Sequence, residues 1–292
     1  MFGNAWLLLT LAAISWGANA VAGRYAAEQM GPVMLTYLRW QFAVLVVGAL
    51  AWPHLRADRA RLSASWPQVL GLGALGFAGF NLALYWALHY TSAINSAIEQ
   101  SGTPVMIMLL NYLLFRQRVG QVQLLGVMVT VAGVLITASR GSPAALMQAD
   151  LNRGDAIMLI AVFCYASYAV ALRKRPQMHW MSLLFGMSVG AWLATLPALA
   201  LACLGGCALP RADGWLVVGF VVIFPTLMAQ LFFMRGVELI GPNRAGLFIN
   251  LVPIFAAGLA IVLLGETLHA YHVLGFALVL AGIGLAERYA PR

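Results

Sequence analysis

The chain has 292 residues, of which 62% are hydrophobic and only 9% charged, and its net charge is +8. A soluble domain carries about 25% charged residues, so this composition excludes an ordinary soluble fold, whose surface needs that charge for solvation. The basic residues lie in short segments between apolar runs and not in one patch. The positive charge therefore does not predict a nucleic-acid partner.

Apolar runs of about twenty residues recur along the whole chain, and this is the length that a helix needs to cross a hydrocarbon core of about 30 Å. Backbone groups in lipid must be satisfied within each span, so the runs predict helices. The alternating pattern of a membrane β-barrel is absent from the sequence. The predicted spans are 5–24, 32–52, 67–89, 93–115, 120–138, 154–172, 180–203, 214–236, 243–264 and 270–287. We predict an all-α integral membrane protein with ten transmembrane helices.

The distribution of basic residues predicts how these spans lie in the membrane. Twelve of the 17 Lys and Arg residues fall on the side of the two termini, four fall on the opposite side, and Arg39 lies within a span. Basic residues are enriched in cytoplasmic segments. We therefore expect a multi-pass protein of the bacterial inner membrane with both termini in the cytoplasm.

The second half of the chain repeats the first at an offset of 149 residues. Pro104 falls on Pro253 and Trp66 on Trp215 at this spacing, and glycines and leucines of the fifth and tenth spans coincide as well. The matches predict two five-helix repeats, at 1–145 and 150–292. An odd number of spans turns the second repeat over in the membrane, and inverted repeats are typical of secondary transporters.

The residues of both repeats resemble a known family. Pro253, then Leu264-Gly265-Glu266, then the glycine-rich last span are similar to the EamA repeat of the drug/metabolite transporter superfamily. The first repeat departs from the pattern, because Phe115-Arg116-Gln117 stands in place of the Leu-Gly-Glu turn. In overall pattern the chain is most similar to bacterial aromatic amino acid exporters. The resemblance implies export of amino acids, drugs or other metabolites, with no cofactor.

Two prolines predict helix interruptions at matching places of the two repeats. Pro104 follows Gly102 in the fourth span, and Pro253 lies in the ninth. A proline removes a backbone donor and disturbs the preceding turn, and paired interruptions are the best pointer to a transport site. The polar residues around them that we expect to bind substrate are Gln100, Ser101, Thr103 and Asn250. The alternative is a kink that only shapes packing.

Further polar and aromatic residues within spans coincide at the same offset. Trp16 falls on Tyr165, Asn19 on Tyr168, and Asn81 on Gln230, while Tyr85 shares a helix face with Asn81. Polar residues within spans usually face the bundle interior or a water-filled cavity. We therefore add these seven residues to the predicted substrate site. Packing within the bundle is the alternative for the aromatic ones.

Two charged residues, Arg39 and Glu99, lie well inside spans, away from the span ends. Because a lone charge in the membrane is costly, the favoured hypothesis is an ion pair between them. The alternatives are that Arg39 receives a substrate carboxylate, or that Glu99 binds a proton in a coupled cycle.

Glu266, His269 and His272 lack the spacing of known zinc motifs, so no metal is expected, and no phosphate loop or nucleophile elbow occurs in the sequence. We predict a secondary transporter, not an enzyme, which exports aromatic or other apolar amino acids by alternating access around a central cavity. Its partners would be a small-molecule substrate and membrane lipid. The alternatives are another cargo, such as a cationic drug, a purine or a sugar derivative, and less favoured, a passive channel or an intramembrane enzyme.

Overall fold

The computed structural model describes residues 3–116, 120–142, 152–206, 209–241, 245 and 247–288. This part of the chain is helical and contains no strand. The first half comprises α1 (Ala5–Ala26), α2 (Pro32–Ala64), α3 (Trp66–Gly73), the π-helix η1 (Ala74–Gly79), α4 (Phe80–Ala87), α5 (Ala93–Gln100), α6 (Thr103–Phe115) and α7 (Gln121–Ala138). The second half comprises α9 (Arg153–Ala171), the 3₁₀ turn η2 (Leu172–Lys174), α10 (Trp180–Leu204), α11 (Ala212–Val221), the π-helix η3 (Val222–Met228), α12 (Ala229–Ile240), the 3₁₀ turn η4 (Leu247–Leu251), α14 (Val252–Leu264) and α15 (Ala270–Arg288).

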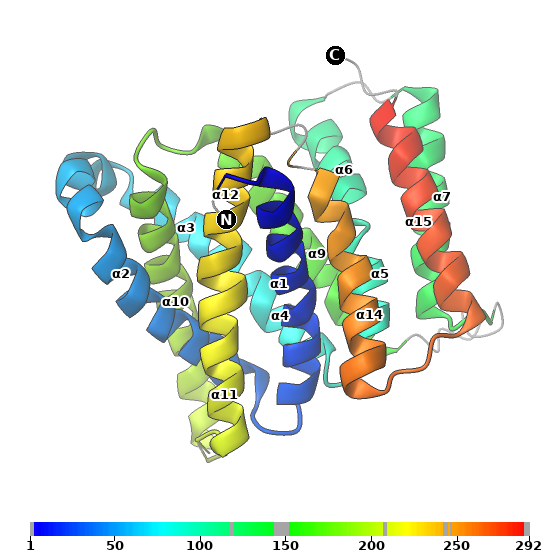
Figure 1. Cartoon of the computed structure of the whole chain (residues 1–292), viewed down its shortest axis with the longest axis horizontal. Coiled ribbons are helices and arrows are strands. Elements are labelled where there is room, and N and C mark those ends of the chain that lie inside the picture. Colours follow the sequence, from blue (N-terminus) through cyan, green and yellow to red (C-terminus); the bar gives the residue numbers. More distant parts are fainter. Residues whose placement is uncertain are drawn as a thin grey trace.

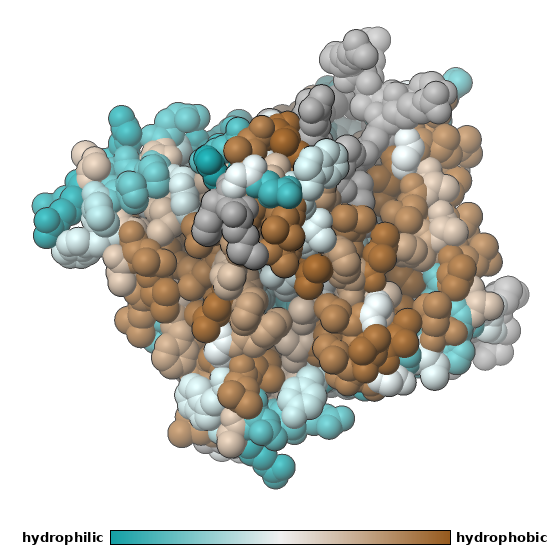
Figure 2. All heavy atoms as spheres, viewed as in Figure 1, coloured by the Kyte–Doolittle hydropathy of each residue, from teal (hydrophilic) through white to brown (hydrophobic). Residues whose placement is uncertain are grey.

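Seven continuous helical segments among the described residues are long and apolar enough to cross a membrane, and α14 and α15 provide two shorter apolar helices. Figure 2 shows a hydrophobic belt around the middle of the visible face, with hydrophilic side chains at both ends. Helix α1 begins and α15 ends toward the same end of the bundle (Figure 1). The prediction of an all-α membrane protein is confirmed, whereas the membrane side of the termini stays a prediction.

The elements of the two halves follow each other at the offset seen in the sequence. Helix α14 starts and ends 149 residues after α6, and α15 starts 149 residues after α7. The π-helices η1 and η3 also correspond at this offset, although no residue pattern predicted them. The division of the chain that we placed between 145 and 150 lies outside the described residues and stays a prediction.

Helix α2 is longer than the span predicted at 32–52. It runs through Pro53 to Ala64, and its last turns carry the exposed residues Arg56, Arg59 and Arg61. A proline costs a helix one hydrogen bond, and water can satisfy the freed carbonyl at this end of the bundle. The charged turns therefore extend the helix beyond the hydrophobic belt.

The last helices of the two halves pack directly against each other, as α7 and α15 in Figure 1. Glycines allow the close approach, because a Cβ atom on Gly133 would lie 2.6 Å from the carbonyl oxygen of Gly275. Small residues at such contacts let membrane helices associate through van der Waals packing.

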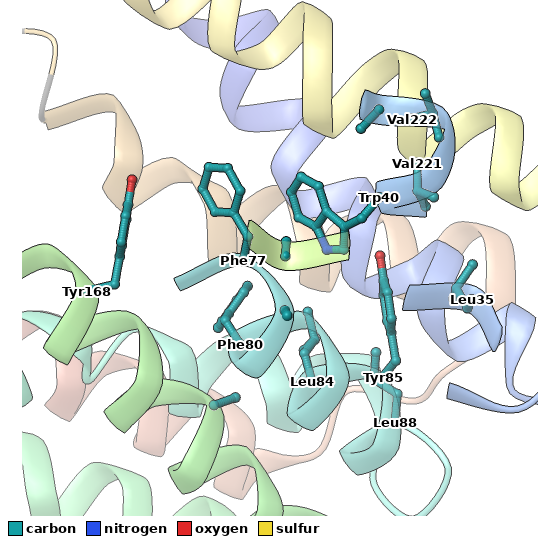
Figure 3. Close-up of a cluster of buried hydrophobic side chains, with 14 of the residues drawn as sticks. Leu35, Trp40, Phe77, Phe80, Leu84, Tyr85, Leu88, Tyr168, Val221 and Val222 are labelled. Atoms are coloured by element: carbon teal, nitrogen blue, oxygen red, sulfur yellow. The ribbon is translucent and has the colours of Figure 1, made fainter. Parts of the chain in front are cut away.

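The centre of the molecule is a buried cluster shared by both halves. Trp40 from α2 stacks on Phe77 from η1, with ring centroids 4.7 Å apart and an interplanar angle of 6°. Figure 3 shows this pair beside Phe80 and Leu84, with Tyr168 of α9 on one side. On the other side lie Val221, the last residue of α11, and Val222, the first residue of η3. The cluster fixes α2, η1 and α4 against the second half of the chain. The candidate site lies at this junction of the two halves.

Candidate substrate cavity

The predicted fourth span is divided at its glycine and proline. Helix α5 ends at Gln100, and α6 begins at Thr103 with Pro104 in its first turn. In the second half, η4 ends at Leu251 and α14 begins at Val252 with Pro253 in its first turn. Proline suits the first turn of a helix, where its missing N–H group needs no partner. Both repeats therefore begin a new helix at the same place within the bundle.

A cavity of about 430 Å³ lies between these two interruptions. Helices and π-helices of both halves contribute to its walls. The predicted site residues that line it are Trp16, Asn19, Arg39, Asn81, Gln100, Ser101, Thr103, Pro104, Tyr165, Gln230 and Pro253. Apolar side chains such as Phe77 and Phe80 form much of the remaining wall. A mostly apolar cavity with a few polar groups suits a small molecule that has an apolar body and a polar head.

The other predicted residues do not line this cavity. Tyr85 is fully buried behind the wall, and Tyr168 packs against Phe77, with ring centroids 5.8 Å apart. Glu99 is 1% exposed and contributes nothing to the wall. The backbone of Asn250 belongs to η4, but its side chain lies outside the described residues.

Arg39 is the charged group of the cavity, and it is 5% exposed. Its Nη1 atom donates hydrogen bonds to Asn19 Oδ1 at 2.7 Å, to Asn81 Oδ1 at 2.8 Å and to Tyr85 Oη at 2.5 Å. Its Nε atom donates to Thr226 Oγ1 at 3.0 Å. Residues of α1, α4 and η3 thus hold one guanidinium group in place.

Arg39 and Glu99 do not form an ion pair in this structure. The ion pairs in the described part of the chain join Arg61 with Asp58 and Arg235 with Glu238. Every hydrogen-bond acceptor around Arg39 is neutral, so its positive charge is not balanced by these contacts. Buried cations are normally paired, and the cavity is where an anion from a substrate can supply that pair.

Thr226 is the partner of Arg39 that could not be found from the sequence. Thr226 lies in η3, where its hydroxyl donates to the carbonyl oxygen of Val221, five residues earlier, at 2.7 Å. The π-helix turns this side chain toward Arg39, and the residue at the matching place in the first half is Phe77, which gives no polar signal. Trp16 donates through Nε1 to the carbonyl oxygen of Pro225 in the same π-helix at 3.2 Å.

An open polar vestibule of about 880 Å³ lies at the end of the bundle where α4 joins α5 and α14 joins α15. Glu266 forms part of it, and its carboxylate accepts hydrogen bonds from the backbone N–H groups of Ala93 and Ile94 at 2.8 and 3.1 Å. The glutamate of the Leu-Gly-Glu turn therefore caps the first turn of α5 in the other half. His272 contacts Asn95 Oδ1 through Nε2 at 2.9 Å.

The chain matches the EamA-like transporter family twice, over residues 3–139 and 152–287, and it belongs to this family. It is therefore a multi-pass membrane transporter of the drug/metabolite transporter superfamily. The family resemblance seen in the sequence is confirmed.

Relatives and a solved structure agree with this assignment. The "Uncharacterized transporter YyaM" of Bacillus subtilis is 23% identical, with 96% of this chain and 92% of the relative covered. A "Probable amino-acid metabolite efflux pump" of Salmonella typhimurium is 25% identical, with 94% and 92% covered. A solved crystal structure has the same fold, with a TM-score of 0.61, 20% identity and full coverage of both chains.

Proposed function

We propose that this transporter exports amino acids with aromatic or other apolar side chains, and that Arg39 binds their carboxylate. The observation that carries the proposal is a buried guanidinium group with only neutral partners, exposed to a largely apolar cavity. A guanidinium group forms strong, charge-assisted hydrogen bonds with a carboxylate. The apolar wall accepts the side chain of the same molecule.

The size of the cavity also supports a small cargo. Its volume of about 430 Å³ falls at the lower end of the range of about 300–1,000 Å³ that is usual for small-molecule sites. The relative from Salmonella typhimurium is described as a probable efflux pump for amino-acid metabolites. A cationic drug is disfavoured, because it would place a second positive charge beside Arg39.

The neutral groups of the cavity have two roles in this proposal. Asn19, Asn81 and Thr226 fix the guanidinium group through the hydrogen bonds described above, so that little ordering is needed when cargo binds. Gln100 and Gln230, which face the cavity from the two halves, offer hydrogen bonds to the ammonium group of the cargo. Rocking of the two halves about their matched helix breaks would expose the cavity to each side in turn.

The orientation is part of the proposal. With both termini in the cytoplasm of a bacterial cell, the vestibule faces outward across the inner membrane, and 12 of the basic residues lie inside. Reaction of an impermeant thiol reagent with single cysteines placed at Gly3 and at Tyr90 tests this arrangement. Labelling from outside should occur at position 90 and not at position 3.

The cargo is tested by uptake of radiolabelled phenylalanine into proteoliposomes that contain the purified protein. We expect saturable uptake that tyrosine and leucine inhibit, whereas phenethylamine, which lacks the carboxylate, does not. Arg39→Gln should lower kcat/KM by roughly ten- to a hundredfold, because a hydrogen bond to a charged group contributes about 1.5–3 kcal/mol. Arg211→Gln, at an exposed position beside α11, serves as the matched control and should transport as the wild type does.

Inhibition by phenethylamine equal to that by phenylalanine would contradict the role of Arg39. Uptake that no amino acid inhibits would reject the cargo. Flux that does not saturate would favour the passive channel, and a chemically altered product found by mass spectrometry would favour the intramembrane enzyme.

A further inference from the structure

Two buried carboxyl groups lie next to each other between α5 and α9. Glu99 is 1% exposed and Asp155 is 3% exposed. Thr91 binds Asp155, the side chain of Asn95 on α5 binds Thr91, and Glu99 lies one helical turn after Asn95. They come from different halves of the chain, 56 positions apart in the sequence, and only the packing of α5 on α9 brings them together.

These carboxyl groups lack donors. Both oxygens of Glu99 and Oδ2 of Asp155 have no hydrogen-bond partner among the described residues. The remaining oxygen, Oδ1 of Asp155, accepts a hydrogen bond from the hydroxyl of Thr91 at 2.5 Å. Two adjacent carboxylates cannot both be ionised in a buried place without a large cost, and a proton shared between them removes that cost.

We propose that Glu99 and Asp155 form a proton-binding site in which the two carboxyl groups share one proton. The shared proton then lies in a hydrogen bond between one oxygen of Glu99 and Oδ2 of Asp155, and it supplies the donor that these two buried oxygens lack. Release transfers this proton to water and leaves two carboxylates. A metal ion fits less well, because neither the cavity nor the vestibule is lined by Glu99 or Asp155, whereas a proton needs no such space.

The site lies between the vestibule and the cavity. On one side, Thr91 and Asn95 are part of the vestibule wall, and the side-chain amide of Asn95 donates to the hydroxyl of Thr91 at 3.3 Å. The Thr91 hydroxyl therefore joins the vestibule to Asp155. On the other side, Gln100 and Ser101 follow Glu99 in the chain and line the cavity.

The charges around the pair do not replace the proton. The elements packed against α5 and α9 carry ionisable side chains. These are Arg24 and Tyr25 on α1, Tyr85 on α4, Tyr112 on α6, Arg140 after α7, Arg153, Cys164, Tyr165 and Tyr168 on α9, Arg173 and Lys174 on η2, Glu266 before α15, and Tyr271 and His272 on α15. Arg140 is the cation that acts on Asp155, and its own side chain is exposed. Arg24 instead donates to the carbonyl oxygen of Leu88 at 2.7 Å.

A proton held at this place can couple its own flow to transport. Movement of α5 against α9 would separate the two carboxyl groups and release the proton, and the same helix carries part of the cavity wall. The proton site does not depend on which cargo is bound, so the amino-acid proposal can fail while this site remains.

The test is infrared spectroscopy of the purified wild-type protein in liposomes, which detects protonated carboxyl groups by their C=O absorption. We expect a protonated carboxyl band at neutral pH that shifts in D₂O, because the vestibule gives water access, and that disappears as the pH is raised. Glu99→Gln should remove the band. Asp155→Asn should move its disappearance to lower pH, because the neutral amide removes the negative charge that opposes release of the shared proton.

The matched control is Glu238→Gln, which changes an exposed carboxylate paired with Arg235 at 2.7 Å and should leave the band unchanged. Absence of the band from the folded wild-type protein, or its persistence in Glu99→Gln, would overturn the proposal. Titration of the band in Asp155→Asn at the wild-type pH would also overturn it, because the proton would not be shared. Loss of the band on adding sodium at constant pH would assign the pair to a metal ion instead.

Discussion

Helix α2 of the first half carries Arg39 to the cavity, and the corresponding helix of the second half, α10, carries Ser188 at the matching position. The hydroxyl of Ser188 is fully buried and donates to the carbonyl oxygen of Leu184 at 2.8 Å. The backbones of the two halves break at the same places, at Pro104 and Pro253 and in the two π-helices. Under the proposed function, the shared breaks would supply two similar hinges, whereas a cargo with one carboxylate would need only one cation. The halves therefore resemble each other in backbone and differ in charge.

A cation placed in the second half would remove this difference in charge. Among the variants considered, we expect it to have the largest effect on folding. Ser188→Arg buries a charge that has no partner, and such a change costs about 3 kcal/mol or more in a membrane span or a protein interior. We expect a strong loss of folded protein, measured by size-exclusion chromatography in detergent. Ser188→Ala is the control and should retain most of the yield. A normal yield of Ser188→Arg would mean that the second half tolerates the charge.

A second difference between the halves lies at Gly73, whose equivalent in the second half is Val222. A Cβ atom on Gly73 would lie 1.9 Å from the carbonyl oxygen of Met187, a backbone atom that cannot rotate away. Gly73→Ala should lower the free energy of unfolding by about 1–3 kcal/mol through overpacking. The measurement is the thermal unfolding midpoint of the purified protein.

Gly71→Ala on the same helix is the matched control, because nothing lies within 4 Å of its Cβ position. Alanine favours the helix over glycine by about 1 kcal/mol, so this variant should be as stable as the wild type or more so. Equal midpoints for the two variants would contradict the close contact between α3 and α10.

Glu266, in the Leu-Gly-Glu turn of the second half, caps the start of α5. The first half has no glutamate at the corresponding place in its sequence. Glu266→Ala removes the acceptor of two N–H groups at the start of α5, and the loss should cost about 1–2 kcal/mol, as for other helix caps. Glu238→Ala, which removes an exposed ion pair, should cost about 1 kcal/mol or less. Chemical unfolding in mixed micelles compares the two variants, and a larger cost for Glu238→Ala would reject the cap.

The smallest effect concerns the start of α10. The Nδ1 atom of His179 accepts a hydrogen bond from the N–H group of Met181 at 3.3 Å, and its ring stacks on His54 of α2 at 3.6 Å. The corresponding helix α2 begins after Gly31 with no side-chain cap. Desolvation, together with repulsion from His54, holds the pKa of His179 below its usual value of 6.5, although Asp58 acts in the opposite direction.

The folded chain therefore binds this proton less readily than the unfolded chain. The stability that neutral His179 contributes is fully present above pH 6.5 and is lost as the pH falls through the lower pKa of the folded state. The effect should be small, because the side chain is exposed. His179→Asn keeps an N-cap acceptor but does not titrate, so its unfolding midpoint should fall less on acidification. An identical fall in both proteins would contradict the role of His179.

Hydrophobic length and repetition were sufficient to predict much of the backbone. Ten apolar runs, two prolines and one offset predicted the helices, their interruptions and the correspondence of the two halves. They could do so because the requirements of lipid act on each segment of about twenty residues separately. The offset also selected Trp16, Asn81, Tyr165 and Gln230, which line the cavity.

Contacts between distant side chains could not be predicted in this way. The sequence singled out Arg39 and Glu99 as the charges well inside spans and suggested that they pair, because a lone charge in the membrane is costly. That cost does not tell which helices are neighbours, and the tertiary structure gives each charge a different surrounding. The packing of α2 beside α4 and η3, with the reach of the Arg39 side chain to α1, places Arg39 among neutral acceptors. The packing of α5 on α9 places Glu99 beside Asp155. The sequence by itself thus determined the spans and their repeat, while only the packing of the helices decided which polar groups meet.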